Sequence, residues 1–248
     1  MFADLSLTLL LVVFAIAGAI VVAASIRATG LADVIADRTR MGEAMAGGII
    51  LGGATSLSGV VVSITAAAGG DASLAVSNAV GGIAAQTLFL AIADLLHKRA
   101  NLEHAAAEPA NLFQAVMLIV LLSLPIAAMA GPDIAYFGVH PVSVVMFLAY
   151  LAGVKLSSAV SEKPMWRPVE TRETRHDEPE EDTDPNASAK GPAITFATLV
   201  AVMGCAGWVI SQIGGEFITR FGLASSLVGA LITAVITSLP ELVTTLVA

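Results

Sequence analysis

A short polar motif, Thr237-Ser238-Leu239-Pro240-Glu241, lies inside a long apolar segment. A carboxylate near the middle of a membrane span costs about 2.5 to 3.5 kcal/mol on insertion scales, so Glu241 indicates a functional site. Because Pro240 lacks a backbone N–H group, we expect a helix break there that frees carbonyl groups one turn earlier. Those carbonyls, two hydroxyls and one carboxylate would form the oxygen-only site that Ca²⁺ and Na⁺ prefer. The alternative is a kinked helix whose Glu241 lies near the helix end or pairs with a neighbour.

An earlier stretch nearly repeats this motif. Residues 54–59 align with residues 236–241, and both contain a Thr-Ser pair, which in the first copy is Thr55 and Ser56. Only the second copy carries a carboxylate. The similarity also includes two short segments that precede the copies at nearly the same distance, residues 39–42 and 219–222. This pattern predicts an internal duplication, a leading sequence sign of a secondary transporter.

The elements that must position these motifs are membrane helices. Of the 248 residues 56% are hydrophobic and only 13% are charged, and the mean hydropathy is +0.85. Such a composition is too apolar for a soluble domain and predicts an integral membrane protein of the all-α class. About seven segments are long enough to span a bilayer. They are residues 5–26, 44–68, 73–96, 112–130, 141–159, 193–213 and 223–248.

Basic residues mark alternate connections between these segments. Every Lys and Arg except Arg220 lies in or beside the first, third or fifth connection. The positive-inside rule then places these connections in the cytoplasm and the N-terminus outside, with a plasma (inner) membrane as the expected location. In this orientation the second and seventh segments cross the membrane in opposite directions. The two motifs are therefore predicted to form an inverted repeat.

Residues 161–192 interrupt the apolar pattern with five prolines and an acidic run at residues 177–182. Because this stretch has almost nothing to bury, we expect a disordered cytoplasmic linker. It separates a five-helix first half, residues 1–160, from the start of a second half, residues 193–248. The acidic run lacks the ligand spacing and turn glycine of a calcium-binding loop.

The two motifs resemble the paired alpha-repeats of the sodium/calcium exchanger (cation/calcium antiporter) superfamily. The residues that carry the resemblance are 55–57, 77–81 and 237–243. It implies an inverted-repeat transporter bundle of roughly ten membrane helices in its complete form, in which four segments meet at mid-membrane around Na⁺ and Ca²⁺. It also implies alternating access driven by a sodium or proton gradient. The cation ligands that it implies are Glu241, Thr237, Ser238, Thr55, Ser56 and Asn78, and the implied helix break is at Pro240.

The first motif departs from the family pattern. Gly59 replaces a glutamate and Ser58 replaces a proline, whereas the resemblance implies a site with at least two acidic residues. Asn78 and Gln86 lie about two helical turns apart, so their amides would suit a monovalent ion or simply hold helices together. Further departures in the same helix are Gly82 and Ile83.

Two functional hypotheses follow. The first is a secondary active antiporter that moves Ca²⁺ or another cation against Na⁺ or H⁺. The second is a transport-inactive or fragmentary membrane protein with a structural or assembly role, because the sequence ends seven residues after Glu241 and C-terminal helices are expected to be missing. The expected partners are the lipid bilayer, inorganic cations and a possible second copy of the chain, with no resident cofactor. No nucleophile–base pair, phosphate loop or basic face suggests an enzyme or a nucleic-acid-binding protein.

Overall fold

The computed structural model describes residues 2–39, 50, 52–97, 101–105, 107–132, 134–162, 164, 166–167, 169, 171–172 and 188–247. Within these residues every regular element is a helix, apart from one isolated bridge between Tyr136 and Val139. Four helices are long and apolar enough to cross a membrane, or five if a bent pair counts as one span. The predicted all-α membrane protein is therefore confirmed.

The candidate spans correspond to the apolar segments of the sequence. The four long ones lie in α1 (Leu7–Thr39), α5 (Ala72–Leu96), α7 (Pro109–Met129) and α9 (Lys190–Phe221). The bent pair joins Ser225–Thr237 to Leu239–Leu246 at an angle of 41°. Shorter apolar stretches lie in α4 (Leu57–Ala68) and α8 (Pro141–Glu162). Each predicted segment thus contains a helix, although part of the second, residues 44–49 and 51, lies outside the described residues.

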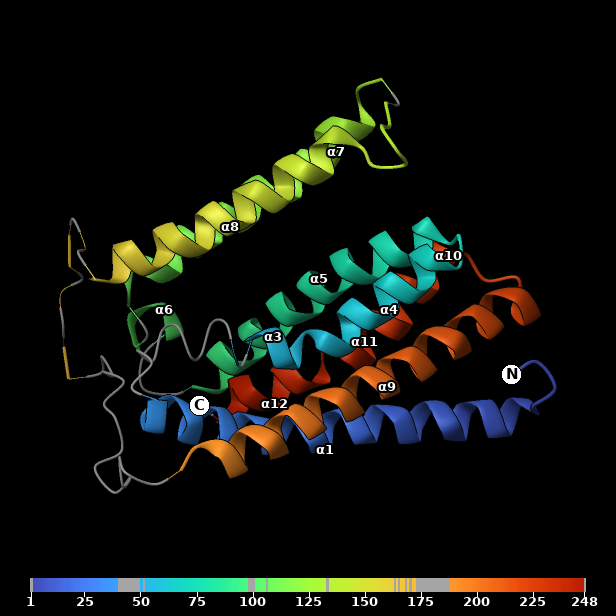
Figure 1. Cartoon of the computed structure of the whole chain (residues 1–248), viewed down its shortest axis with the longest axis horizontal. Coiled ribbons are helices and arrows are strands. Elements are labelled where there is room, and N and C mark those ends of the chain that lie inside the picture. The colour runs from blue at the N-terminus through green and yellow to red at the C-terminus, as the bar shows by residue number, and fades with distance from the viewer. Residues whose placement is uncertain are drawn as a thin grey trace. The chain divides into compact units, whose positions relative to one another are not determined.

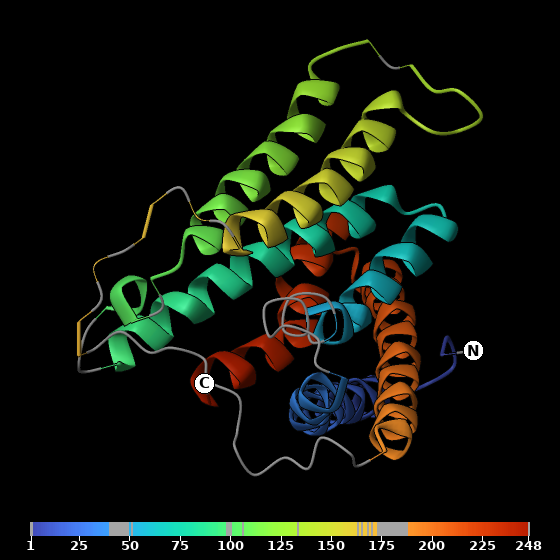
Figure 2. The ribbon, with the colours of Figure 1, turned by 60° about the vertical axis from the view of Figure 1, so that its left-hand side comes forward.

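The chain divides into two compact units, residues 1–97 with 177–248, and residues 98–176. In the second unit, which also holds α6 (Leu102–Ala105), α7 and α8 lie side by side (Figure 2). A hydrogen bond of 2.9 Å from Gln114 Nε2 to Ser157 Oγ joins them. The acidic run at residues 177–182 and most of the predicted linker lie outside the described residues.

The first unit is built around α9. This helix packs along α1 and also against α4 (Figure 1). α4 in turn contacts α5, and α5 contacts a C-terminal series of short helices. That series consists of α10 (Ser225–Leu227), η2 (Val228–Thr233), α11 (Ala234–Thr237) and α12 (Leu239–Val247). Apolar side chains such as Val21, Val62 and Ile210 fill the interior between α1, α4 and α9.

Two glycines allow the helix backbones to approach closely. A Cβ atom on Gly81 in α5 would lie 2.5 Å from Ala230 Cα in η2. A Cβ atom on Gly207 in α9 would lie 2.5 Å from the carbonyl oxygen of Ser58 in α4. Because real Cβ atoms do not come this close, both crossings depend on glycine, as expected for membrane helices that pack through small residues.

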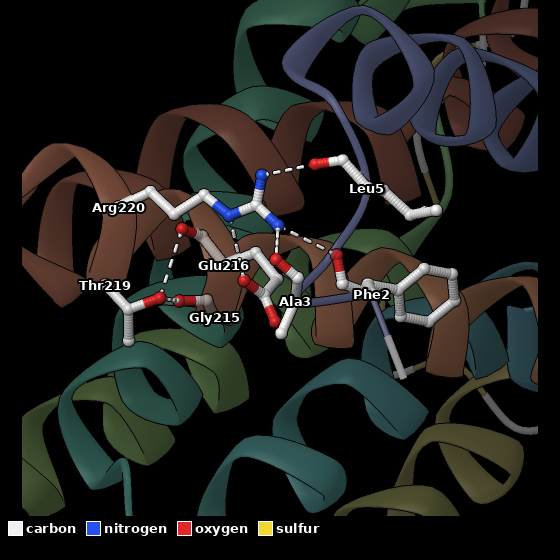
Figure 3. A network of polar contacts seen from close by, with 7 residues as sticks. All are labelled: Phe2, Ala3, Leu5, Gly215, Glu216, Thr219 and Arg220. Carbon is white, nitrogen blue, oxygen red and sulfur yellow. Dashed lines mark hydrogen bonds and ion pairs between the residues drawn. The ribbon is translucent and has the colours of Figure 1, made fainter.

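Arg220, in the last turn of α9, ties the N-terminal segment to this helix (Figure 3). Its guanidinium group donates hydrogen bonds to the carbonyls of Phe2 at 2.9 Å, of Leu5 at 2.6 Å and of Ala3. It also pairs with Glu216 at 3.2 Å. Arg220 is the one basic residue that does not lie in or beside a predicted cytoplasmic connection. The network gives it a structural role instead.

Candidate functional site

Each copy of the motif lies at an interruption between two helices. In the first copy α3 (Gly52–Thr55) ends before Ser56 and α4 begins after it. In the second copy α11 ends before Ser238 and α12 begins after it. Equivalent serines therefore mark both interruptions. Interrupted membrane helices are typical of the sites where transporters bind ions.

Pro240 lies two residues after Ser238, the point where the helix is interrupted. It is the second residue of α12, and a proline in the first turn of a helix removes no intrahelical hydrogen bond. The first copy is interrupted at the same motif position although Ser58 takes the place of the proline. The interruption at Ser56 therefore does not require a proline.

The two copies contact each other directly. Ser58 Oγ donates a hydrogen bond of 3.3 Å to the carbonyl oxygen of Thr237, which the interruption after α11 makes accessible. Ser56 Oγ donates a hydrogen bond of 3.4 Å to Glu241 Oε1. These contacts join residues 179 and 185 positions apart in the sequence. The structure thus brings the polar residues of both motifs together in one cluster.

Asn78, from α5, connects the first copy to η2, which directly precedes the helix α11 of the second copy. Its Nδ2 donates to the carbonyl oxygen of Gly59 at 3.1 Å and to Ser63 Oγ at 3.0 Å. Its Oδ1 accepts a hydrogen bond of 2.7 Å from Thr233 Oγ1. Asn78 therefore links α4, α5 and η2, and both of its amide protons are used within the protein.

Thr233 was not identified from the sequence. It is fully buried at 0% exposure in the π-helical segment η2, and helices of this kind occur frequently at functional sites. The signal that could have found it is its spacing from Thr237, because residues four apart share a helix face. Its contact with Asn78 joins α5 to η2, the segment that precedes the second copy of the motif.

The cluster is buried and rich in oxygen. Six of its side chains are at most 4% exposed: Thr55, Ser58, Asn78, Thr233, Thr237 and Ser238. Several hydroxyls donate their protons to carbonyls of their own helix, as Thr237 Oγ1 does to Thr233 O at 2.9 Å. A hydroxyl that has donated its proton can still accept through its lone pairs. These oxygens are therefore available as ligands for a cation.

Glu241 provides a carboxyl group. Ser56, which is exposed, donates to Oε1, and the hydroxyl of Thr55 lies beside the same carboxylate. Oε2 is buried and has no hydrogen-bond partner among the described residues. A buried carboxylate oxygen without a donor is costly, so it fits a place where a cation binds.

Two positions that depart from the family pattern border the cluster. A Cβ atom on Gly59 would lie 3.4 Å from Thr237 Oγ1 and 3.9 Å from Asn78 Nδ2. A Cβ atom on Gly82 would lie 3.4 Å from Ser238 Oγ. A side chain at position 59 would therefore point toward the same oxygens as the rest of the cluster. Gln86 is half-buried further along α5.

Comparison with known protein families gives one match. The family model described as sodium/calcium exchanger protein matches residues 9–158, which is more than half of the chain. The matched region contains the first copy of the motif and Asn78, whereas Glu241 lies beyond it. No curated protein and no solved structure matches the chain.

Proposed function

Because this chain belongs to the sodium/calcium exchanger family and is therefore a cation/calcium exchanger-type membrane transporter, we propose that it is a secondary active antiporter. It moves Ca²⁺ or another cation against Na⁺ or H⁺ by alternating access. The cation binds where the two interrupted helices meet, and Glu241, Thr237, Ser238, Thr55 and Ser56 are the proposed ligands. Members of this family are transporters rather than enzymes.

The observation that carries this proposal is the contact between the two motifs. Ser56 donates to Glu241 and Ser58 donates to the carbonyl of Thr237, so hydroxyl groups of the first repeat contact both the carboxylate and a backbone carbonyl of the second. Each repeat also has a helix interruption at the cluster. A segment with an interruption can absorb the dihedral change that alternating access requires without unfolding a continuous helix.

Asn78 has a positioning role in this proposal. Its amide hydrogen bonds to Gly59, Ser63 and Thr233 hold α4, which carries the end of the first motif, and η2, which leads into the second, against α5. Because Oδ1 accepts one hydrogen bond, from Thr233, a single lone pair of this atom is left that could bind a cation. Asn78 was proposed as a ligand from the sequence, but we now assign it the role of holding the neighbouring helices in place.

The test is cation flux in vesicles that contain the purified full chain. An outward gradient of Na⁺ or H⁺ should drive uptake of a radioactive cation, and Glu241→Gln should abolish this uptake because the variant keeps the size of the side chain but loses its charge. Glu216→Gln is the matched control, because it removes a carboxylate at the end of α9, where Glu216 pairs with Arg220. Equal uptake by the wild type and Glu241→Gln would refute the assignment of the ligand.

The proposed location is the plasma (inner) membrane, with the N-terminus outside. Cys205 is the single cysteine of the sequence and is exposed on α9, so a Cys205→Ser chain offers a background for new cysteines. A cysteine introduced at Asp4 should react with an impermeant thiol reagent added outside intact cells. Reaction only after the cells are opened would reverse the proposed orientation.

A further inference from the structure

We propose that the segment before α1, residues 2–6, is a strap that holds one end of the first unit closed, and that Arg220 is the positioning residue that fastens it. Release of the strap opens a path from this end to the polar cluster of the two motifs. Two contacts of the strap support this role, one polar and one apolar. Its part in transport rests on the proposed function, whereas its effect on closure can be measured without transport.

The polar contact is made by the guanidinium group of Arg220 (Figure 3). It donates hydrogen bonds to the backbone carbonyls of Leu5 at 2.6 Å, of Phe2 at 2.9 Å and of Ala3. A further donor, Nε–H, binds Glu216 Oε2 at 3.2 Å. Because a guanidinium group presents its donors in a fixed planar fork, this set of bonds fixes both the position and the orientation of the strap against the last turn of α9.

The apolar contact is made by the side chain of Phe2, which is 8% exposed. Phe2 belongs to an apolar cluster, here called the end cluster, to which α4, α5, α9 and η2 all contribute. Its other buried members include Ala66, Leu74, Ala75, Phe217 and Val228. The ring of Phe2 also lies 6.4 Å from the ring of Trp208. The strap therefore reaches into the interior between the helices instead of lying on their surface.

The end cluster continues the helix faces that carry the polar cluster. On α5 Leu74 precedes Asn78 by four residues, and both are buried. On α4 Ala66 follows the buried Ser58 by eight residues. Because residues at these spacings share a helix face, an ion that moves between the polar cluster and this end of the unit has to pass the end cluster. An apolar constriction excludes ions until it opens.

The strap is suited to release because its polar contacts lie near the surface. The side chain of Arg220 is 26% exposed, and its acceptors are backbone carbonyls of a non-helical segment. Water can therefore replace these hydrogen bonds when the strap leaves. Withdrawal of Phe2 removes a large ring from the end cluster while α4, α5 and η2 remain helical. A local opening of this kind needs less free energy than global unfolding.

The first experiment measures closure at Ala75, a buried member of the end cluster near the start of α5. In a purified Cys205→Ser chain in lipid nanodiscs, Ala75→Cys reports the entry of a water-soluble thiol reagent. Arg220→Ala should accelerate this modification on the order of tenfold. This factor corresponds to about 1.4 kcal/mol, which is about the net value of one hydrogen bond to a charged group.

Two controls separate release of the strap from a general loosening of the fold. Ala93→Cys lies buried near the other end of α5 and should react no faster when Arg220→Ala is added. Glu216→Gln should not accelerate modification of Ala75→Cys, because the amide oxygen still accepts from Arg220 Nε. Unchanged reactivity of Ala75→Cys in the Arg220→Ala chain, or equal acceleration at both cysteines, would overturn the inference.

The second experiment tests whether the strap has to move during transport. Ala3 and Glu216 both contact the guanidinium group of Arg220, so cysteines at these two positions can be joined by a short bifunctional thiol reagent (Figure 3). In vesicles of the Cys205→Ser chain with Ala3→Cys and Glu216→Cys, linking should abolish cation flux. Reductive cleavage of the linker should restore this flux. The same reagent on a chain with Ala3→Cys alone should have no effect.

The two experiments also separate the strap from the antiporter. Full flux in the linked chain would overturn the inference and leave the antiporter proposal standing. An absence of flux in both the wild type and the unlinked chain would refute the antiporter, and the reactivity of Ala75→Cys would then decide whether the strap closes this end of the unit.

Discussion

Removal of the Asn78 side chain should loosen the contact between the two motifs by a predictable amount. Asn78→Ala deletes three hydrogen bonds, to Gly59 O and Ser63 Oγ in α4 and from Thr233 in η2. Hydrogen bonds between helices of a membrane protein average about 0.6 kcal/mol in double-mutant cycles, so the three together contribute about 2 kcal/mol. Values for groups left unpaired in soluble proteins, about 1 to 3 kcal/mol each, would predict a larger loss. The membrane value applies here because helices that separate within a bilayer or micelle find other partners.

The assay is the free energy of unfolding in detergent micelles, followed by circular dichroism during denaturant titration. Thr233→Val should cost about 0.6 kcal/mol, and the double variant with Asn78→Ala should show a coupling energy of about the same 0.6 kcal/mol, because one hydrogen bond joins the two side chains. Thr198→Val is the control, because the exposed Thr198 hydroxyl bonds only to Ile194 O in its own helix. A coupling energy of zero, or an Asn78→Ala loss no greater than that of the control, would refute the view that Asn78 joins the two motifs.

Two further predictions concern the packing around the site. Gly81→Ala should destabilise the fold by about 1 to 3 kcal/mol, because the new Cβ would lie 2.5 Å from Ala230 Cα. Gly53→Ala, where nothing lies within 4 Å, should not; equal unfolding free energies for the two would contradict the close crossing of α5 and η2. Arg220→Ala should increase amide hydrogen exchange at residues 2–6, because the carbonyls of Phe2, Ala3 and Leu5 lose their donor. Unchanged exchange there would show that Arg220 does not hold the N-terminal segment.

The sequence predicted the membrane class and the family well because both depend on local patterns. Long apolar segments define membrane helices regardless of how those helices pack. The repeated Thr-Ser pair indicated an inverted repeat, and the structure places Ser56 within hydrogen-bond distance of Glu241. Those patterns also identified Gly59 as the place where the first repeat lacks its acid.

The details of the cluster could not be predicted because they depend on partners far apart in the chain. A threonine in an apolar helix ordinarily bonds to its own backbone, so Thr233 gave no sign of its contact with Asn78, 155 positions away. Pro240 predicts a disrupted turn just before it, and the helix is interrupted there, at Ser238, whereas no proline predicts the interruption at the equivalent Ser56.

The central claim is that a cation binds where the two interrupted helices meet, and the most direct measurement is the position of a bound ion. Crystals of the full chain grown with Tl⁺, a monovalent ion with strong anomalous scattering, should show one anomalous peak. The account predicts this peak beside Glu241 Oε2, within reach of the Thr237 and Ser56 hydroxyls, and its loss in Glu241→Gln crystals. A peak elsewhere in the protein, or one that persists in Glu241→Gln, would contradict the claim.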